Sequence, residues 1–308
     1  MKKMCLLVLC QSLTFILLGQ KISSFPSNTK KIEMLFPEGK TKAVIFSYDD
    51  GMIADRKLVK LMNIYGIKGT FHLNSNKLDT KGYLTKAEIN NLFKGHEVSV
   101  HSANHPGLGD LSKQEIMNEV LEDRRELERL THKTVRGMAY PFGNYNDKVI
   151  DAITGLGIEY ARTVNDSYHF SIPKHFLIWE PSIHQFAKAY YIANDTLNDK
   201  KELAIFNKLV TDFLQSDTLA LLDIWGHSWE NEGAGNRWKK TEDLFKLLSK
   251  RKEVHFATQI DLVDYINAFN ILKFSVNKNI VFNPSALNVY IRVNNKSIKV
   301  PAGGKVFI

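Results

Sequence analysis

The chain has 308 residues, of which 44% are hydrophobic and 24% charged, and a formal net charge of +8. These values are typical of a soluble globular protein with a sizeable core, and they exclude disordered, collagen-like and coiled-coil proteins. No run of Lys and Arg is interleaved with aromatic residues, so nothing indicates a nucleic-acid partner. The basic surplus is compatible with an anionic glycan or a cell surface, and equally with a solvated surface that has no partner.

The first 22 residues are predicted to be a signal peptide. Lys2 and Lys3 precede an apolar run over residues 4–18, which is too short and too interrupted for a comfortable membrane span. We therefore expect a secreted or periplasmic protein without stable membrane insertion after cleavage, and an uncleaved N-terminal anchor is the alternative. Both cysteines, Cys5 and Cys10, lie in this segment, so the mature chain would have no disulfide, thiol catalysis or thiolate metal site.

From residue 43 to residue 269, short β-branched or aromatic runs alternate with amphipathic segments of helical length. Predicted helices cover residues 54–65, 85–95 and 112–130, and the last two each begin at a capping box. Predicted strands cover residues 43–48, 69–74, 97–102, 135–140, 158–164, 177–180, 218–225 and 253–258. Strands that alternate with helices indicate a parallel sheet in an α/β protein. Polar residues just after the strands favour a barrel, because barrel enzymes place their sites there.

After residue 270 the pattern changes to short strands separated by Asn, Pro and Gly. These strands cover residues 279–282, 288–293, 297–300 and 305–308. They predict a small C-terminal β appendage over residues 271–308, which either braces the barrel or binds sugar.

Two clusters carry residue types suited to metal chemistry. Asp49 and Asp50 end an apolar strand and precede Gly51, whose turn can direct both carboxylates into one pocket. One carboxylate would then bind a metal while the other accepts a proton from water. His101 lies at the end of the predicted strand over residues 97–102, and His105 follows that strand. Their spacing of four residues suits metal ligands in a helical turn. Each cluster by itself is also compatible with an ordinary turn.

A third cluster places a single histidine after a deeply apolar strand. His227 lies between Trp225 and Trp229, whose flat rings suit sugars. A histidine in this position is commonly a hydrogen-bonded core residue, but beside two tryptophans it is a candidate general acid of a carbohydrate site.

In this order and spacing, the clusters resemble the polysaccharide deacetylase family, which is the NodB homology or carbohydrate esterase family 4, over residues 38–269. The motif T-F-D-D-G corresponds to residues 47–51, and H-[ST]-x-x-H to residues 101–105. The Y-P-[FY]-G variant of the third motif corresponds to residues 140–143, and the final strand-and-histidine motif ends at His227. The resemblance implies a distorted (β/α)7-type barrel over residues 38–270.

The resemblance also implies a function. Asp50, His101 and His105 would hold a divalent metal, usually zinc, although cobalt, nickel and manganese suit the same ligands. Asp49 would be the general base and His227 the general acid. The enzyme would remove acetyl groups, chiefly N-acetyl, from an acetylated polysaccharide or oligosaccharide by attack of metal-bound water. An O-acetyl esterase of the xylan type and a catalytically idle glycan-binding barrel remain as alternatives.

Substrate contacts are expected from aromatic residues near these motifs, and a backbone N–H of Tyr140 or a neighbour is expected to stabilise the oxyanion. The expected substrate-binding residues are Tyr140, Pro141, Phe142, Trp179 and Trp225.

The sequence departs from the family pattern at two motifs, and other residues must take over the roles of the missing ones. Ala139 stands where many members have the arginine that orients the base, and Arg162 at the end of the next strand is the predicted substitute, with Arg136 second. The D-x-x-D-W motif is also not matched. Glu180 lies roughly where that motif belongs and is the expected partner of His227.

Overall fold

The computed structural model describes residues 30–308 except 187–195 and 234. The predicted signal peptide, with Cys5 and Cys10, lies outside the described residues. Within the described ranges, no helix combines the length and the apolar composition that crossing a membrane requires.

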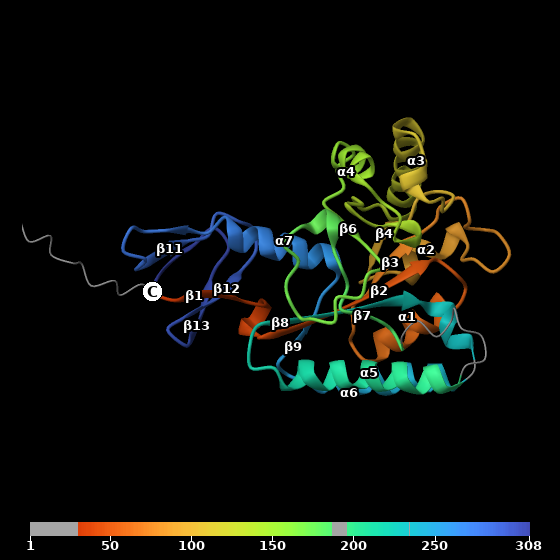
Figure 1. Cartoon of the computed structure of the whole chain (residues 1–308). Helices are drawn as coiled ribbons and strands as arrows, with labels where there is room; N and C mark the ends of the chain where they lie inside the picture. Colours follow the sequence, from red (N-terminus) through yellow and green to blue (C-terminus); the bar gives the residue numbers. More distant parts are fainter. Residues whose placement is uncertain (1–29, 187–195, 234) are drawn as a thin grey trace, which may run out of the picture. The chain divides into compact units, whose positions relative to one another are not determined.

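A curled, all-parallel sheet forms the centre of the fold (Figure 1). Its strands are β2 (Lys42–Asp50), β3 (Thr70–Leu73), β4 (Glu97–Val100), β5 (Gly137–Ala139), β6 (Tyr160–Arg162), β7 (Ile183–His184), β8 (Ala220–His227) and β9 (Val254–Phe256). Seven of them follow the order β6-β5-β4-β3-β2-β8-β7, and β9 pairs with β2 off this path. Strand β2 is the pivot, because β8 pairs with nearly all of it, β9 with its first residues and β3 with its last.

A narrow bridge links the two ends of this sheet. Trp179 pairs with Arg162 of β6 in parallel, and its N–H donates to the carbonyl of Ala161 over 3.0 Å. A few residues later the chain enters β7, which pairs with β8. The prediction of an α/β fold with a distorted, seven-stranded barrel is therefore confirmed.

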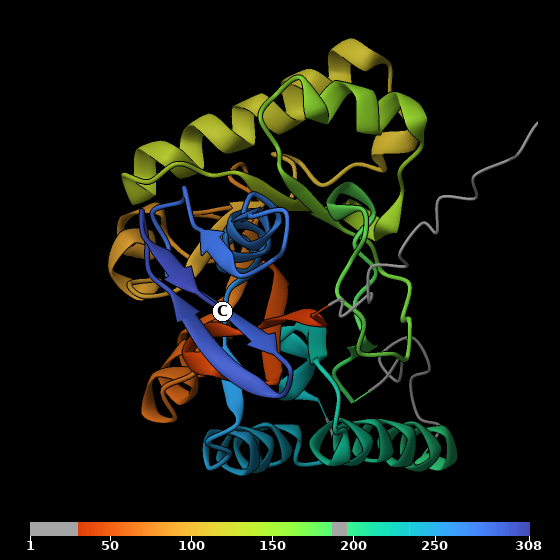
Figure 2. The ribbon, with the colours of Figure 1, turned by 90° about the vertical axis from the view of Figure 1, so that its left-hand side faces the viewer.

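Helices cover the outside of the curled sheet (Figures 1 and 2). They are α1 (Asp55–Ile64), α2 (Ile89–Leu92), α3 (Lys113–Thr131), α4 (Asp147–Thr154), α5 (Thr196–Gln215), α6 (Arg237–Ser249) and α7 (Gln259–Asn270). Helices α5 and α6 lie side by side on one flank, and α3 and α4 lie together on the opposite flank. Both predicted capping boxes form. The helix expected over residues 85–95 is shorter, a 3-10 turn at Lys86–Glu88 followed by α2.

Buried polar side chains line part of the barrel interior. Val44, Phe46 and Tyr48 of β2 point outward into the core beneath the helices, so the alternating residues Ser47 and Asp49 point inward. The same alternation on the other strands gives a buried polar lining: Ser47, Asp49, Thr70, His72, Ser99, Arg162 and Asp223. Gly137 leaves room for this lining, since a Cβ there would lie 2.0 Å from the Tyr160 ring.

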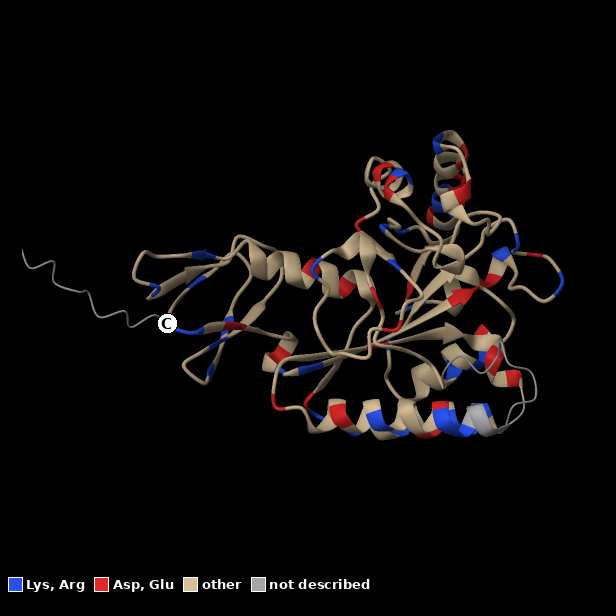
Figure 3. Cartoon of the chain, in the orientation of Figure 1, with Lys and Arg blue, Asp and Glu red and all other residues tan. Residues whose placement is uncertain are grey.

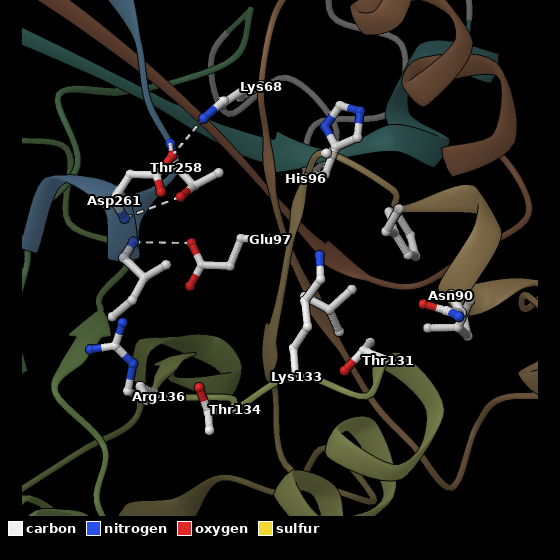
Figure 4. Close-up of a pocket in the computed structure, with 15 residues that line it drawn as sticks. Lys68, Asn90, His96, Glu97, Thr131, Lys133, Thr134, Arg136, Thr258 and Asp261 are labelled. Carbon is white, nitrogen blue, oxygen red and sulfur yellow. Dashed lines mark hydrogen bonds and ion pairs between the residues drawn. The ribbon is translucent and has the colours of Figure 1, made fainter. Parts of the chain in front are cut away.

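A cavity of about 270 Å³ lies at the amino ends of β3, β4 and β5 (Figure 4). Several of its charged side chains are paired, for example Lys68 with Asp261 of α7 at 3.1 Å. Glu97 accepts the N–H of Ile260 over 3.1 Å. These contacts tie α7 to the base of the barrel, at the opposite ends of the strands from the Asp and His motifs.

The C-terminal segment forms two three-stranded antiparallel sheets. One has the order β1-β12-β13, with β1 (Ile32–Leu35), β12 (Val289–Val293) and β13 (Lys296–Val300). The other has the order β10-β11-β14, with β10 (Lys273–Phe274), β11 (Ile280–Phe282) and β14 (Lys305–Phe307). The four predicted strands are present, and β1 and β10, which were not predicted, join them. The Tyr265 hydroxyl of α7 donates to the Leu35 carbonyl over 2.6 Å and accepts the Tyr290 N–H over 2.9 Å.

Candidate active site

The three predicted metal ligands converge at the carboxyl ends of β2 and β4. The two Nε2 atoms of His101 and His105 are 3.1 Å apart. They lie 3.9 Å and 3.7 Å, respectively, from Oδ1 of Asp50. A positive φ of 85° at Asp50, followed by Gly51, turns this carboxylate towards the histidines although Asp49 and Asp50 are neighbours on one strand.

Buried hydrogen bonds hold the loop that carries these histidines. The carbonyl of Ala139 lies 2.9 Å from Nδ1 of His101, and because a carbonyl only accepts, Nδ1 carries the proton and Nε2 keeps its lone pair. Asp123 of α3 accepts the backbone N–H groups of Ser75 at 2.7 Å and His101 at 2.9 Å. Sequence reasoning missed Asp123. A carboxylate on the buried face of a helix, between Val120 and Leu127, was the available signal.

The donor set fits a divalent cation. Two imidazole nitrogens and one carboxylate oxygen suit zinc and similar borderline metals. Bonds of about 2.0–2.1 Å place tetrahedral ligands about 3.3 Å apart, near the separations seen here. Burial lowers the pKa of His101, and burial with the neighbouring His101 lowers the pKa of His105 to about 4, so both rings are neutral ligands. Trp229 holds the second oxygen of Asp50 through its indole N–H at 3.0 Å.

Asp49, the predicted base, is buried beside this centre and contacts Arg162. Nη2 of Arg162 donates to both carboxylate oxygens of Asp49, and Nη1 donates to the Thr163 carbonyl at 2.8 Å. The guanidinium also stacks on the Trp225 ring at 4.6 Å. Burial alone would raise the pKa of Asp49, but Arg162 and then His101 hold it well below its usual range. Arg162 thus contacts Asp49, as expected of the residue that substitutes for the missing arginine.

Arg136, the second candidate for this role, lies elsewhere. It pairs with Glu159 at 3.0 Å and with Asp264 of α7 at 2.7 Å. It therefore belongs to the base of the barrel and does not orient Asp49.

His227, the predicted acid, faces the same centre from the end of β8, with its Nε2 4.0 Å from Oδ2 of Asp50. Its Nδ1 lies 2.8 Å from Glu230, whose same oxygen is 3.1 Å from Nε2 of the buried His184. Burial alone would lower the pKa of His227, but the hydrogen bond and charge of Glu230, followed by Asp50, raise it to about 9.

The prediction that Glu180 is the partner of His227 is wrong, because the Glu180 side chain is exposed. Glu230 takes its place from three residues beyond the histidine. The spacing His-x-x-Glu at the start of a short helical turn was the local signal, and it forms a capping-box contact in the structure. His184 carried no signal in the sequence.

Of the five predicted substrate-binding side chains, Phe142 alone is exposed, at 67%. Its ring centroid lies 4.5 Å from that of His105. Tyr140, Pro141, Trp179 and Trp225 are buried. The prediction that the two tryptophans present faces to a sugar is wrong, because their rings fill the barrel: Trp179 packs on Tyr160 and Trp225 packs on Arg162.

The predicted oxyanion donor also changes. The N–H of Tyr140 donates to the Arg162 carbonyl at 3.0 Å and is therefore occupied. The N–H of Phe142 forms no hydrogen bond that involves the described residues. Phe142 adopts a left-handed conformation, φ 57°, in the turn between Pro141 and Gly143. Its backbone N–H, rather than that of Tyr140, is therefore the candidate donor to the oxyanion.

The carboxyl end of the curled parallel barrel thus brings together buried, paired carboxylates and histidines, and comparisons with known proteins match the region that carries most of them. Residues 37–161 match the family described as polysaccharide deacetylase. The peptidoglycan-N-acetylglucosamine deacetylase PgdA of Listeria monocytogenes is 29% identical over 136 residues, which cover 43% of this chain and 28% of that protein. The putative polysaccharide deacetylase YxkH of Bacillus subtilis is 23% identical over 120 residues, or 38% of this chain and 43% of that one.

The fold has a counterpart among solved structures. A putative polysaccharide deacetylase from Mycobacterium smegmatis superimposes with a TM-score of 0.58 at 14% identity, covering 76% of this chain and 93% of that one. The chain matches less than half the length of both curated relatives. Residues 37–161, which match the polysaccharide deacetylase family, contain Asp49, Asp50 and both histidines of the candidate metal site.

Proposed function

We propose that this protein is a metal-dependent deacetylase that removes N-acetyl groups from an amino-sugar polymer. One observation carries the proposal: a candidate metal site, an ionised carboxylate and a protonated histidine share one mouth of the barrel. The printed name of the PgdA relative, a peptidoglycan-N-acetylglucosamine deacetylase, supports the N-acetyl assignment.

Each side chain then has a separate task. A divalent cation, zinc by the chemistry of the donor set, would be held by Asp50, His101 and His105 and would supply a Lewis acid that polarises the acetyl carbonyl and lowers the pKa of water. Asp49 takes the proton from the attacking water, because Arg162 keeps it ionised and fixes its direction.

The remaining groups handle the charge that the reaction develops. The Phe142 N–H donates to the carbonyl oxygen as that oxygen becomes negative. His227 then gives its proton to the leaving nitrogen, and Glu230 keeps the ring protonated until that moment. The exposed Phe142 ring provides a flat contact for the sugar beside the acetyl group.

Acetate release is the direct test. The substrates are chitin oligomers, peptidoglycan, poly-N-acetylglucosamine and acetylated xylan, each assayed with and without a chelator and after metal is returned. We expect release from an amino-sugar polymer, loss on chelation and recovery with zinc. Release from acetylated xylan alone would instead identify an O-acetyl esterase, and glycan binding without release from any substrate would identify an idle barrel.

A matched pair of histidine variants assigns the metal site. His105→Gln should abolish both metal binding and acetate release, since it removes one of three ligands. His132→Gln, an exposed residue at the end of α3, should change neither. Equal metal content in the two variants would place the metal elsewhere.

We also propose that the enzyme is exported to a secreted or periplasmic location by residues 1–22. The basic start and apolar run of that segment support this proposal. N-terminal sequencing of the protein recovered outside the cytoplasm should begin after this segment, whereas an intact N-terminus in the membrane fraction would indicate an uncleaved anchor.

A further inference from the structure

The C-terminal β segment has an unusual charge composition. Residues 271–308 contain six Lys and Arg and no Asp or Glu, a formal charge of +6, while the whole chain carries +8. Arg292 lies 3.7 Å from Glu33 of β1, but the five lysines form no ion pair within the part of the chain that the structure describes. The charged residues of this segment are accordingly drawn in blue on a mainly tan ribbon in Figure 3.

One sheet of this segment presents aromatic rings among these lysines. In the sheet β10-β11-β14, Lys273 pairs with Phe282, and Phe282 pairs with Lys305, so the three side chains form one row on one face. The next row pairs Ile280 with Phe307. Val281 points to the opposite face and is buried in the small core, whereas Phe282 is 42% and Phe307 74% exposed.

We propose that this basic aromatic face, formed by Lys273, Ile280, Phe282, Lys305 and Phe307, binds an anionic polysaccharide chain. Exposed aromatic rings on a small sheet face mark an interaction surface, because their burial on a partner is favourable. The ammonium groups on both sides of Phe282 attract carboxylate or phosphate groups of the partner. The choice of a glycan rests on the proposed function, since the face would then hold the acidic groups of an amino-sugar polymer, such as peptidoglycan, on which the barrel acts.

The arrangement of the rows favours a polymer over a lipid surface. A segment that inserts into a membrane interface has its apolar side chains on one face and its basic ones on the opposite face. Here Lys273 and Lys305 stand beside Phe282 in the same row. Inserting the Phe282 ring into a membrane would therefore draw two ammonium groups towards the acyl chains. A chain of sugars with acidic groups can instead lie along the row and contact both the aromatic ring and the ammonium groups.

The experiment measures binding of the full mature chain to polygalacturonate by isothermal titration calorimetry at low and physiological salt. Uncharged pullulan, phosphatidylserine vesicles and single-stranded DNA serve as comparison ligands. Lys273→Gln/Lys305→Gln should weaken binding to polygalacturonate about tenfold, because the two exposed charges that attract its carboxylates are removed. Phe282→Ala/Phe307→Ala should weaken it by a similar factor.

Lys296→Gln/Lys299→Gln is the matched control. It removes the same charge from exposed positions of β13, in the other sheet of the segment, and should retain most of the affinity. An equal loss of affinity for the two lysine double variants would show that net charge alone determines binding, and it would overturn the proposal. Tighter binding to vesicles or to DNA than to polygalacturonate would also overturn it.

The two proposals fail separately. The variants of the basic aromatic face should release acetate from a soluble chitin oligomer at the wild-type rate, because they lie outside the barrel. An active enzyme whose affinity does not depend on the face would reject only the binding face. If the chain binds polygalacturonate through this face but releases no acetate, only the proposed deacetylase activity is rejected.

Discussion

The mouth and the interior of the barrel each contain a buried aspartate, and the two differ in charge state. Asp49 at the mouth is held ionised by the guanidinium of Arg162. Asp223 lies deeper on β8, paired in register with Ile45, four residues before the level of Asp49. Burial raises the pKa of Asp223 to about 7, in spite of the nearby charge of Arg162.

The difference shows that contact with a cation, rather than its presence in the same cavity, decides the charge of a buried carboxyl. Arg162 donates to both oxygens of Asp49, whereas Asp223 has a long contact of 3.5 Å from the Gln259 amide. One guanidinium compensates the desolvation of one carboxylate. At neutral pH the barrel therefore keeps Asp49 at its mouth ionised, whereas Asp223, with a pKa of about 7, is only partly ionised.

The largest effect is expected from Arg162→Ala. Removing one partner of a buried ion pair leaves the other charge uncompensated, so the free energy of unfolding should fall by about 3–5 kcal/mol. Turnover should fall far more than metal affinity, because the metal ligands remain. Urea unfolding, acetate release and metal titration measure the three quantities. Arg136→Ala, whose ion pairs are half-exposed, is the control and should cost about 1 kcal/mol or less.

Asp49→Asn tests the base directly. Turnover should fall by about 10²–10⁴, the usual contribution of a general base, while the metal content stays unchanged. Asp50→Asn should do the reverse and lose metal first. Loss of metal from Asp49→Asn would mean that the two neighbouring aspartates have exchanged roles.

Asp223→Asn tests the interior. The folded pKa of about 7 lies above the ordinary value of 3.8, so this group stabilises the protein at low pH, and that contribution is lost as pH rises from about 4 through 7. The loss amounts to about 4 kcal/mol, since the pKa difference is about 3 units and one unit corresponds to about 1.4 kcal/mol. The stability of the variant should therefore decline less over this range. Exposed Asp151→Asn should retain the wild-type profile, and a parallel profile for Asp223→Asn would contradict the assignment.

The smallest effect concerns the acid. With Glu230→Gln, the pKa of His227 should fall, since its hydrogen-bonded anion is lost, and the alkaline limb of the pH–kcat profile should move down by about 1–3 units. In the wild type that limb is expected near pH 9, where His227 loses its proton. Glu180→Gln should not move it, because Glu180 is exposed. A shift of equal size in both variants would remove Glu230 from this role.

Local pattern was enough to predict the strand-and-helix order and most of the candidate site. Asp49 and Asp50 share one strand end, and His101 and His105 share one loop, so a few residues of strand and turn geometry bring each pair to the barrel mouth. The carboxyl ends of parallel strands then bring the pairs together. Arg162 was also predictable, because it ends the strand next to the third motif.

The sequence by itself thus determined the residues that carry the chemistry, whereas tertiary structure decided which partner each one has and which faces are exposed. His184 reaches Glu230, the partner of His227, because β7 packs beside β8. Trp179 and Trp225 are buried because the closing barrel needs volume in its interior. β1 pairs with β12 across more than 250 residues of chain. Such contacts depend on the packing of distant segments, and no local period or spacing encodes them.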